Sequence, residues 1–421
     1  MLKQASGTVL ARVIVTAMNL LVMVLAGHAL GAEGLGMISL VVLGITLVML
    51  PANLIGGGAL VYLVPRVALG RLIWPAYAWA AVSTALAWFV LHRFPLVPEG
   101  YTTHVCLLAL VQAVYSVHLG VLLGQQRIAR HNVISVVHAA TLLVVFGAVL
   151  FRREHVDVMA YVQASYAAFG LTAVLSALSI DRHARVKDQE HPHVARTLLR
   201  QGLWVQGANA SQLMNYRLAY WIIEHALGRA SLGLYSVGTQ LAESAWIAPR
   251  SLGMVLVSRV SNLDEVARQR RLTLLTAKVA IAFALAVVLV LAILPDAVFQ
   301  LAFGEDIAGL RPILLLLAPG IISMSASQAF SHYFSGKGQN RHNLVGSGLG
   351  MLITAGLGWW AVRQWGLEGA ALTASLAYSA SVIYQWTVFS RRHHTRLRDL
   401  WPNAEDVARL RDVARSLFRR S

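Results

Sequence analysis

The chain has 421 residues, of which 57% are hydrophobic and only 13% are charged. Soluble domains carry roughly 25% charged residues, so this composition excludes an ordinary soluble protein and indicates a polytopic membrane protein. The formal net charge of +16 does not indicate a nucleic-acid partner, because no nucleic-acid-binding fold or aromatic stacking platform accompanies the basic residues.

Apolar segments long enough to cross a bilayer, about 20 residues each, follow one another along the chain. They predict about twelve transmembrane helices, at 8–30, 35–62, 73–92, 101–123, 133–150, 157–179, 201–226, 232–257, 272–294, 307–334, 343–362 and 367–390. The long segments 35–62 and 307–334 contain Pro51, and Pro312 with Pro319, respectively. We expect a kink or a break in each of them.

An internal repeat relates the two halves. The sequence His-Ala-Leu-Gly occurs at 28–31 and again at 225–228, and each copy joins two apolar segments. A second repeated sequence, Arg-His-Asn, occurs at 130–132 and 341–343. Six predicted spans separate the copies, so both halves have the same orientation in the membrane. We therefore expect an all-α polytopic membrane protein with two six-helix bundles related by a parallel repeat.

The distribution of Lys and Arg predicts the orientation, because cytoplasmic loops carry the excess of these residues. One side holds only six of the 35, namely Arg93, Arg152, Arg153, Arg229, Arg311 and Arg363. Both termini are therefore expected on the cytoplasmic side of the membrane. The bundles would be residues 1–180 and 201–390, joined by a basic linker at 181–200 and followed by a basic tail at 391–421. After Trp401 the tail has the pattern of an amphipathic helix on the anionic leaflet.

Histidines in the linker raise the question of a metal site. His183, His191 and His193 lack a cysteine or an ordered ligand spacing, so a solvated linker is the favoured interpretation.

Arg217, near the middle of the seventh segment, is the first candidate for function. An ionisable residue at mid-bilayer costs at least about 2.5–3.5 kcal/mol to insert, so it usually faces the bundle interior. At helical spacing it belongs to a polar stripe with Gln206, Asn209, Tyr216, Tyr220 and Glu224. The stripe predicts a cargo-binding surface. The alternative is that Glu224, or a residue of another helix, neutralises Arg217 for packing alone.

The eighth segment repeats this pattern, with Ser236, Thr239, Gln240, Glu243 and Arg250 on one face. Pro249 can kink this helix. Glu243 is the only acidic residue well inside any predicted span, and a buried carboxylate can carry a proton near neutral pH. Glu243 is therefore the candidate for H⁺ or Na⁺ coupling, and a structural ion pair with Arg217 or Arg250 is the alternative.

The first segment carries Arg12, Thr16 and Asn19 on one face, and Arg12 is close enough to its end either to anchor the helix or to bind cargo. Cations then outnumber acids inside the spans, which favours an anionic cargo, and arginine suits phosphate through its bidentate fork. Further polar residues bond either to neighbouring helices or to a hydroxyl-rich cargo; they are Gln112, Ser116, His118, Ser325, Gln328 and His332. No phosphate-binding loop, nucleophile elbow or zinc-helix motif is present in the sequence.

Four stretches resemble polysaccharide transporters of the multidrug/oligosaccharidyl-lipid/polysaccharide (MOP) exporter superfamily, in particular the O-antigen flippases of the Wzx type. They are LGAEGLG at 30–36 leading into GGGALV at 56–61; LG at 227–228 with LGLYSV at 232–237 and IAP at 247–249; FSGKGQN at 334–340; and GLEGAA at 366–371. With the number of spans, the resemblance covers almost the whole chain. The lipid II flippase branch usually has two further helices, for which this chain has no room.

The resemblance implies a V-shaped, twelve-helix secondary transporter that works by alternating access and needs no cofactor. Its cargo would be an undecaprenyl-pyrophosphate-linked oligosaccharide, an O-antigen or exopolysaccharide repeat unit, moved from the cytoplasmic to the periplasmic leaflet. Partners would include a polysaccharide polymerase and a chain-length regulator. Family members share few functional residues, so Arg12, Arg217, Arg250, Asn209, Gln206, Tyr220 and Glu243 rest on the physical reasoning above. The alternatives are a small-molecule antiporter of the MATE kind, a membrane glycan polymerase or glycosyltransferase, and a scaffold for glycan assembly.

Overall fold

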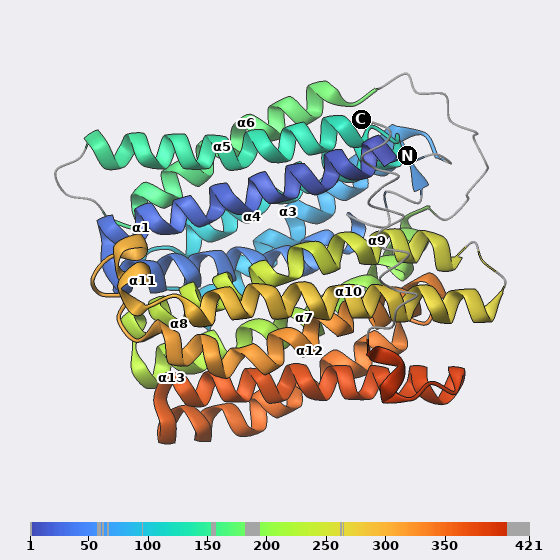
Figure 1. Ribbon diagram of the computed structural model, residues 1–421. Coiled ribbons are helices and arrows are strands. Elements are labelled where there is room, and N and C mark those ends of the chain that lie inside the picture. Colours follow the sequence, from blue (N-terminus) through green and yellow to red (C-terminus); the bar gives the residue numbers. More distant parts are fainter. Residues whose placement is uncertain are drawn as a thin grey trace.

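The computed structural model describes residues 2–56, 60, 63–64, 67–94, 96–152, 157–181, 194–261, 263 and 265–401. These residues form helices that lie side by side along one long axis (Figure 1). Among them, eight helices are long and apolar enough to cross a membrane. The prediction of an all-α polytopic membrane protein is confirmed. The three linker histidines and the tail beyond Trp401 lie outside the described residues.

The N-terminal half forms one side of the molecule, coloured blue to green in Figure 1. Its first element, α1, contains two antiparallel spans that meet at Gly31, where the backbone is not helical. The elements are α1 (Leu2–Ala52), the 3₁₀ helix η1 (Asn53–Ile55), α3 (Leu69–Arg93), α4 (Thr102–Gly124), α5 (Ile128–Arg152) and α6 (Met159–Ser179).

The C-terminal half forms the other side, coloured yellow-green to red in Figure 1. Here α13 contains the last two spans, which meet at Gly366. The elements are α7 (Val194–Leu227), α8 (Arg229–Glu243), η2 (Ser244–Trp246), α9 (Ile247–Ser261), α10 (Val266–Ile293), α11 (Asp296–Phe303), α12 (Leu310–Gly336), α13 (Arg341–His393) and η3 (Leu397–Leu400). Dividing α1 and α13 at their bends, and counting α8, η2 and α9 as one span, gives the expected six spans in each half among the described residues.

The repeated turn has the same backbone in both halves. Gly31 has φ 65° and ψ −170°, and Gly228 has φ 85° and ψ 177°. A positive φ is unfavourable for residues with a Cβ, which explains why glycine closes both copies. We name the end of the bundle that holds Gly31 and Gly228 the turn end, and the end that holds residue 2 and residue 401 the terminal end.

A second turn, at the terminal end, is also built twice. In the N-terminal half Gln126 has φ 59° and the Arg127 N–H donates to the Leu122 carbonyl; in the C-terminal half Gly338 has φ 68° and the Gln339 N–H donates to the Phe334 carbonyl. The Arg-His-Asn copies begin the helices that follow these turns.

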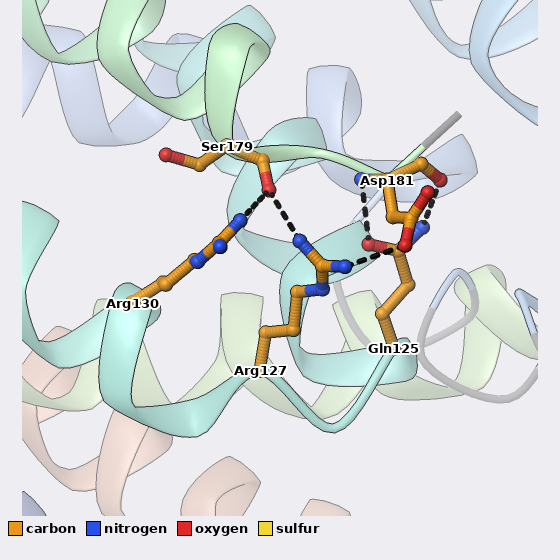
Figure 2. A network of polar contacts seen from close by, with 5 residues as sticks. All are labelled: Gln125, Arg127, Arg130, Ser179 and Asp181. Atoms are coloured by element: carbon orange, nitrogen blue, oxygen red, sulfur yellow. Dashed lines mark hydrogen bonds and ion pairs between the residues drawn. The ribbon is translucent and has the colours of Figure 1, made fainter. Parts of the chain in front are cut away.

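Side chains tie the first of these turns to the end of α6 (Figure 2). Arg127 donates to the Asp181 carboxylate at 2.5 Å and to the Ser179 carbonyl at 3.2 Å, and Arg130 donates to that same carbonyl at 3.0 Å. Gln125 donates to the Asp181 carbonyl and accepts from the Asp181 N–H. Two arginines thus cap the C-terminal end of α6, where cations are favoured by the helix dipole.

The predicted eighth span is broken rather than only kinked. A 3₁₀ turn, η2, separates α8 from α9, because Pro249 has no N–H to donate to the carbonyl four residues earlier. The Trp246 side chain is fully buried and donates to the Ile321 carbonyl of α12 at 3.2 Å, which anchors the break.

Three further boundaries differ from the sequence-based expectation. α7 begins at Val194, inside the residues expected to form the linker, and α11 is an additional short helix. α1 ends just after Pro51, as expected, but α12 stays continuous through Pro312 and Pro319. The Ser375 hydroxyl, inserted beside Pro319, donates to the Leu316 carbonyl and accepts from the Gly320 N–H.

The two halves meet tightly at the turn end. A Cβ on Gly36 of α1 would collide with the Arg229 carbonyl oxygen of α8, and a Cβ on Gly233 would collide with the Ala32 carbonyl oxygen. These contacts are related by the same offset as the His-Ala-Leu-Gly copies. The repeat therefore brings α1 and α8 into backbone contact and closes the space between the halves at this end.

Candidate functional site

Three cavities lie between the halves and reach from the middle of the bundle toward the terminal end. The central chamber, of 510 Å³, is lined by α1, α5, α6, α7, α8, η2 and α9. The C-side pocket, of 520 Å³, lies mainly against α12 and α13, and the N-side pocket, of 640 Å³, lies mainly against α1 and α5. Arg250 lines all three cavities, and Arg12 lines both pockets.

Arg217 and Glu243 face each other across the central chamber as a two-pronged ion pair. Arg217 Nη1 lies 2.8 Å from Glu243 Oε1, and Arg217 Nη2 lies 3.1 Å from Glu243 Oε2. The side chains are 22% and 17% exposed. Arg217 also donates to the Tyr220 hydroxyl at 2.9 Å, and this hydroxyl lies 2.6 Å from Thr239 Oγ1. The structure therefore pairs the strongest cationic candidate with the candidate coupling residue.

Glu224 does not neutralise Arg217. Its carboxylate lies 2.7 Å from His225 Nδ1 and 3.9 Å from Arg229 Nε, at the turn end. Of the partners that the sequence left open for Arg217, the structure selects Glu243.

Arg12 and Arg250 are the unpaired cations of the cleft. Neither has an acidic partner among the described residues. Arg12 donates to Met254 Sδ at 3.4 Å, and the Arg250 guanidinium lies 5.4 Å from the centre of the Trp246 ring. Met254 is one helical turn after Arg250, so a cation from each half lies at the border between the two pockets.

Acidic side chains are scarce on these walls. Glu243 is the one acidic residue that lines any of the three cavities in the described part of the chain, and its charge is balanced by Arg217. Arg12 and Arg250 then leave the cleft with a net positive charge, which favours anions.

The remaining predicted residues divide between the cleft and the packing. Asn209 lines the C-side pocket and donates to Gln206 Oε1 at 3.3 Å, whereas Gln206 donates to the Asn53 carbonyl of η1 and so links the halves. Tyr220 is buried beside Arg217 and also lines the central chamber. Thr16 and Asn19 line the chamber as well, so the face of the first span that holds Arg12 does point into the cleft.

Polar residues predicted on the fourth and tenth spans follow the same division. Ser116 donates to Asn53 Oδ1, His118 bonds to Ser176 and Tyr77, and Ser325 donates to the Ile321 carbonyl, all within the helix packing. Gln328 and His332 line the C-side pocket.

Several lining residues have no counterpart in the sequence-based prediction. His138 and Tyr161 line the central chamber. The C-side pocket gathers a set of hydroxyl and amide side chains from α12, α13 and the turn between them: Ser327, Ser331, Ser335, Asn340, Asn343, Ser347, Ser381 and Gln385. Their spacing carries no single periodic signal, because the packing of two helices against each other assembles the set.

Comparisons with known proteins identify the fold. No family model matches the chain, and no curated protein matches it in sequence. Solved structures do match it over nearly its whole length. A multidrug resistance MATE family transporter of the MOP superfamily, in an inward-facing conformation, is similar with a TM-score of 0.66 and 16% identity, over 92% of this chain and 98% of that one.

Two other structures give a similar result. The lipid II flippase MurJ, in an inward closed conformation, has a TM-score of 0.67 and 12% identity, over 95% of this chain and 89% of that one. A mutant form of the MATE transporter VcmN of Vibrio cholerae has a TM-score of 0.65 and 14% identity, over 95% of this chain and 98% of that one. The chain thus has the fold of these solved MATE and MurJ structures, which confirms the expected MATE/MOP-like architecture.

Proposed function

We propose that this protein is a flippase that moves an undecaprenyl-pyrophosphate-linked oligosaccharide from the cytoplasmic to the periplasmic leaflet of a bacterial inner membrane. The terminal end would face the cytoplasm, in keeping with the Lys and Arg bias of the loops. With the turn end closed by α1 and α8, the cleft reaches toward that side, where such a lipid is made.

The observation that carries this proposal is the charge of the cleft. Arg12 and Arg250 come from different halves, line the same pockets and lack acidic partners among the described residues. A pyrophosphate bridging the two guanidinium groups would connect the halves through charge-assisted hydrogen bonds. An opening of the terminal end would separate the same two groups, so the cargo would favour one conformation over the other.

Glu243 is assigned to coupling with H⁺ or Na⁺ in this proposal. While Glu243 is ionised, it accepts hydrogen bonds from both Nη1 and Nη2 of Arg217. Neutralising Glu243 by a proton or a cation would release Arg217 and add a third cation to the cleft, beside Arg12 and Arg250. Cargo affinity and the ion gradient would then be linked through one ion pair.

A MATE-like antiporter of organic cations is the second candidate, favoured by the similarity to MATE transporters. It would need a carboxylate that is free to meet the cargo, and Glu243 is the one candidate in the described cavities. Since Glu243 is paired with Arg217, an anionic cargo is the better match for the two remaining arginines: Arg250 lines the same chamber, and Arg12 lines both pockets. The structural neighbours are transporters, which favours both candidates over a glycan polymerase or glycosyltransferase.

The test is a comparison of ligands on the purified protein in lipid nanodiscs. We expect undecaprenyl diphosphate to bind and the organic cation ethidium not to bind. A hydrogen bond to a charged group contributes about 1.5–3 kcal/mol, so Arg12→Gln and Arg250→Gln should each weaken carrier binding by about tenfold to a hundredfold.

Arg130→Gln is the matched control, because Arg130 lies at the terminal end but donates to the Ser179 carbonyl rather than lining a cavity. Carrier binding should not change in this variant. The proposal would be overturned in favour of the antiporter if wild type bound ethidium, Glu243→Gln did not, and the arginine variants bound the carrier as wild type does.

A further inference from the structure

The C-side pocket differs from the other cavities in its chemistry. In the described part of the chain its lining is almost wholly neutral and polar, with Arg12 and Arg250 at its border and no acidic residue. Hydroxyl and amide groups of this kind both donate and accept hydrogen bonds, as sugar hydroxyls do.

A connected chain of hydrogen bonds fixes part of this wall. Ser327 donates to Gln385 Oε1 at 2.6 Å, and Gln385 donates to Asn343 Oδ1 at 3.3 Å. Asn343 donates to Ser335 Oγ at 3.1 Å, and Ser335 donates to Asn340 Oδ1 at 2.9 Å. The chain joins α12 to α13 and holds these side chains in set orientations, which lowers the cost of ordering them around a ligand.

Other groups on the same wall have no protein partner. Gln328 is only 6% exposed, lines the pocket, and its amide makes no hydrogen bond with the described residues. The hydroxyls of Ser331 and Ser347 also line the pocket without a partner there. Because the Gln328 side chain is buried except where it faces the pocket, the expected partner of its amide is a ligand or water in the pocket.

We propose that the C-side pocket is the oligosaccharide subsite, with Gln328, Ser331 and Ser347 as hydrogen-bonding residues for sugar hydroxyls. This inference rests on the proposed flippase function, because Arg12 and Arg250 hold the pyrophosphate at the border of the pocket. The glycan extends from that border along the wall formed by α12 and α13, and the prenyl chain stays outside the pocket. Recognition of the glycan therefore belongs to the C-terminal half.

The test uses two probes, undecaprenyl diphosphate without sugar and the lipid-linked oligosaccharide extracted from a strain that lacks this gene. Dissociation constants are measured by native mass spectrometry on the full chain. We expect wild type to bind the glycan-bearing probe more tightly. A neutral hydrogen bond contributes about threefold to tenfold in affinity. The triple variant Gln328→Leu, Ser331→Ala, Ser347→Ala should therefore bind the glycan-bearing probe at least tenfold more weakly than wild type does. Its affinity for the bare carrier should not change.

Two controls separate packing from recognition. Ser323→Ala changes an α12 serine that bonds to Ser379 outside the pocket, and Ser135→Ala changes a serine of the N-side pocket that bonds to the His131 carbonyl. Both should leave the difference between the probes intact. The triple variant must also elute as a single species with an unchanged Tm; if it does not, Gln328→Leu alone is measured, with an expected loss of at least threefold.

The outcomes distinguish this inference from the proposed function. If Arg12→Gln and Arg250→Gln weaken the binding of neither probe, the proposed function fails. Suppose instead that they weaken the binding of both probes. If the triple pocket variant then binds both probes as wild type does, or loses the same affinity for both, the flippase proposal stands and the glycan subsite is refuted.

Discussion

The ion pair between Arg217 and Glu243 gives the sharpest test of how the cleft works, because its two roles predict opposite effects. We consider Glu243→Gln, Arg217→Met and the double variant. In wild type the pair is half-buried, with both prongs engaged at 2.8 and 3.1 Å. The pair stabilises the fold, but it also occupies a cation that an anionic cargo would use.

The expected changes in unfolding free energy and in binding free energy follow from the geometry and the exposure of the pair. Exposed pairs contribute about 0–1 kcal/mol, and removing one partner of a buried pair costs about 3–5 kcal/mol. With side chains 22% and 17% exposed, each single variant should lose about 2–4 kcal/mol of unfolding free energy. For binding, a negative charge opposes an anionic group about 7 Å away by about 0.6–2.4 kcal/mol at dielectric constants of about 80 to 20.

Glu243→Gln should therefore bind undecaprenyl diphosphate roughly three- to fiftyfold more tightly while it unfolds at a lower Tm. Arg217→Met should bind more weakly, and the double variant should lie between the two, near wild type. The assay pairs carrier binding in nanodiscs with thermal unfolding in detergent. Carrier binding that is equally weakened in Glu243→Gln and Arg217→Met would refute the reasoning, since both variants would then act through lost structure.

Two further predictions concern the ends of the bundle. Gly233→Ala should separate α1 from α8 at the turn end, because the new Cβ meets the Ala32 carbonyl. The rate of backbone amide hydrogen exchange in α1 and α8 at that end should rise. The control Gly348→Ala, which has open space around it, should leave this rate unchanged. Asp399 has its pKa lowered below the usual 3.8, first by the hydrogen bond from the backbone N–H of Arg396 and then by Arg270. The ionised Asp399 therefore stabilises the fold at neutral pH, and this stabilisation is lost as the pH falls through the folded-state pKa. Asp399→Asn should lower Tm at pH 7 and should lessen the loss of Tm between about pH 5 and pH 3. A dependence of Tm on acidic pH that is the same in wild type and variant would contradict this.

Much of the fold follows from local sequence signals. The His-Ala-Leu-Gly copies predicted the parallel repeat, and Gly31 and Gly228 do adopt one backbone conformation. Hydrophobic segments predicted the spans because a bilayer requires continuous apolar helices. The break at η2 was foreseen only as a kink, since its position depends on the burial of Trp246 against α12 as well as on Pro249.

The site was predicted less completely, for a physical reason. In-span arginines stand out in a sequence because their insertion is costly, so Arg12, Arg217 and Arg250 were candidates, and all three line the cavities. Their partners are set by helix packing: the sequence left Glu224 and Glu243 open for Arg217, and only the structure selects Glu243. Of the neutral wall of the C-side pocket, the sequence suggested only Gln328 and His332, because serine, asparagine and glutamine are common at helix contacts.

The most direct test of the central claim is the pool of lipid-linked oligosaccharide in a strain of the native bacterium that lacks this gene. The flippase proposal predicts that carrier-linked units accumulate in the inner membrane while surface glycan disappears. Wild type should reverse both effects, whereas the double variant Arg12→Gln, Arg250→Gln, present in the membrane at normal amounts, should not. Unchanged pools of carrier-linked units and surface glycan in the deletion strain would contradict the proposal and leave the antiporter as the better account.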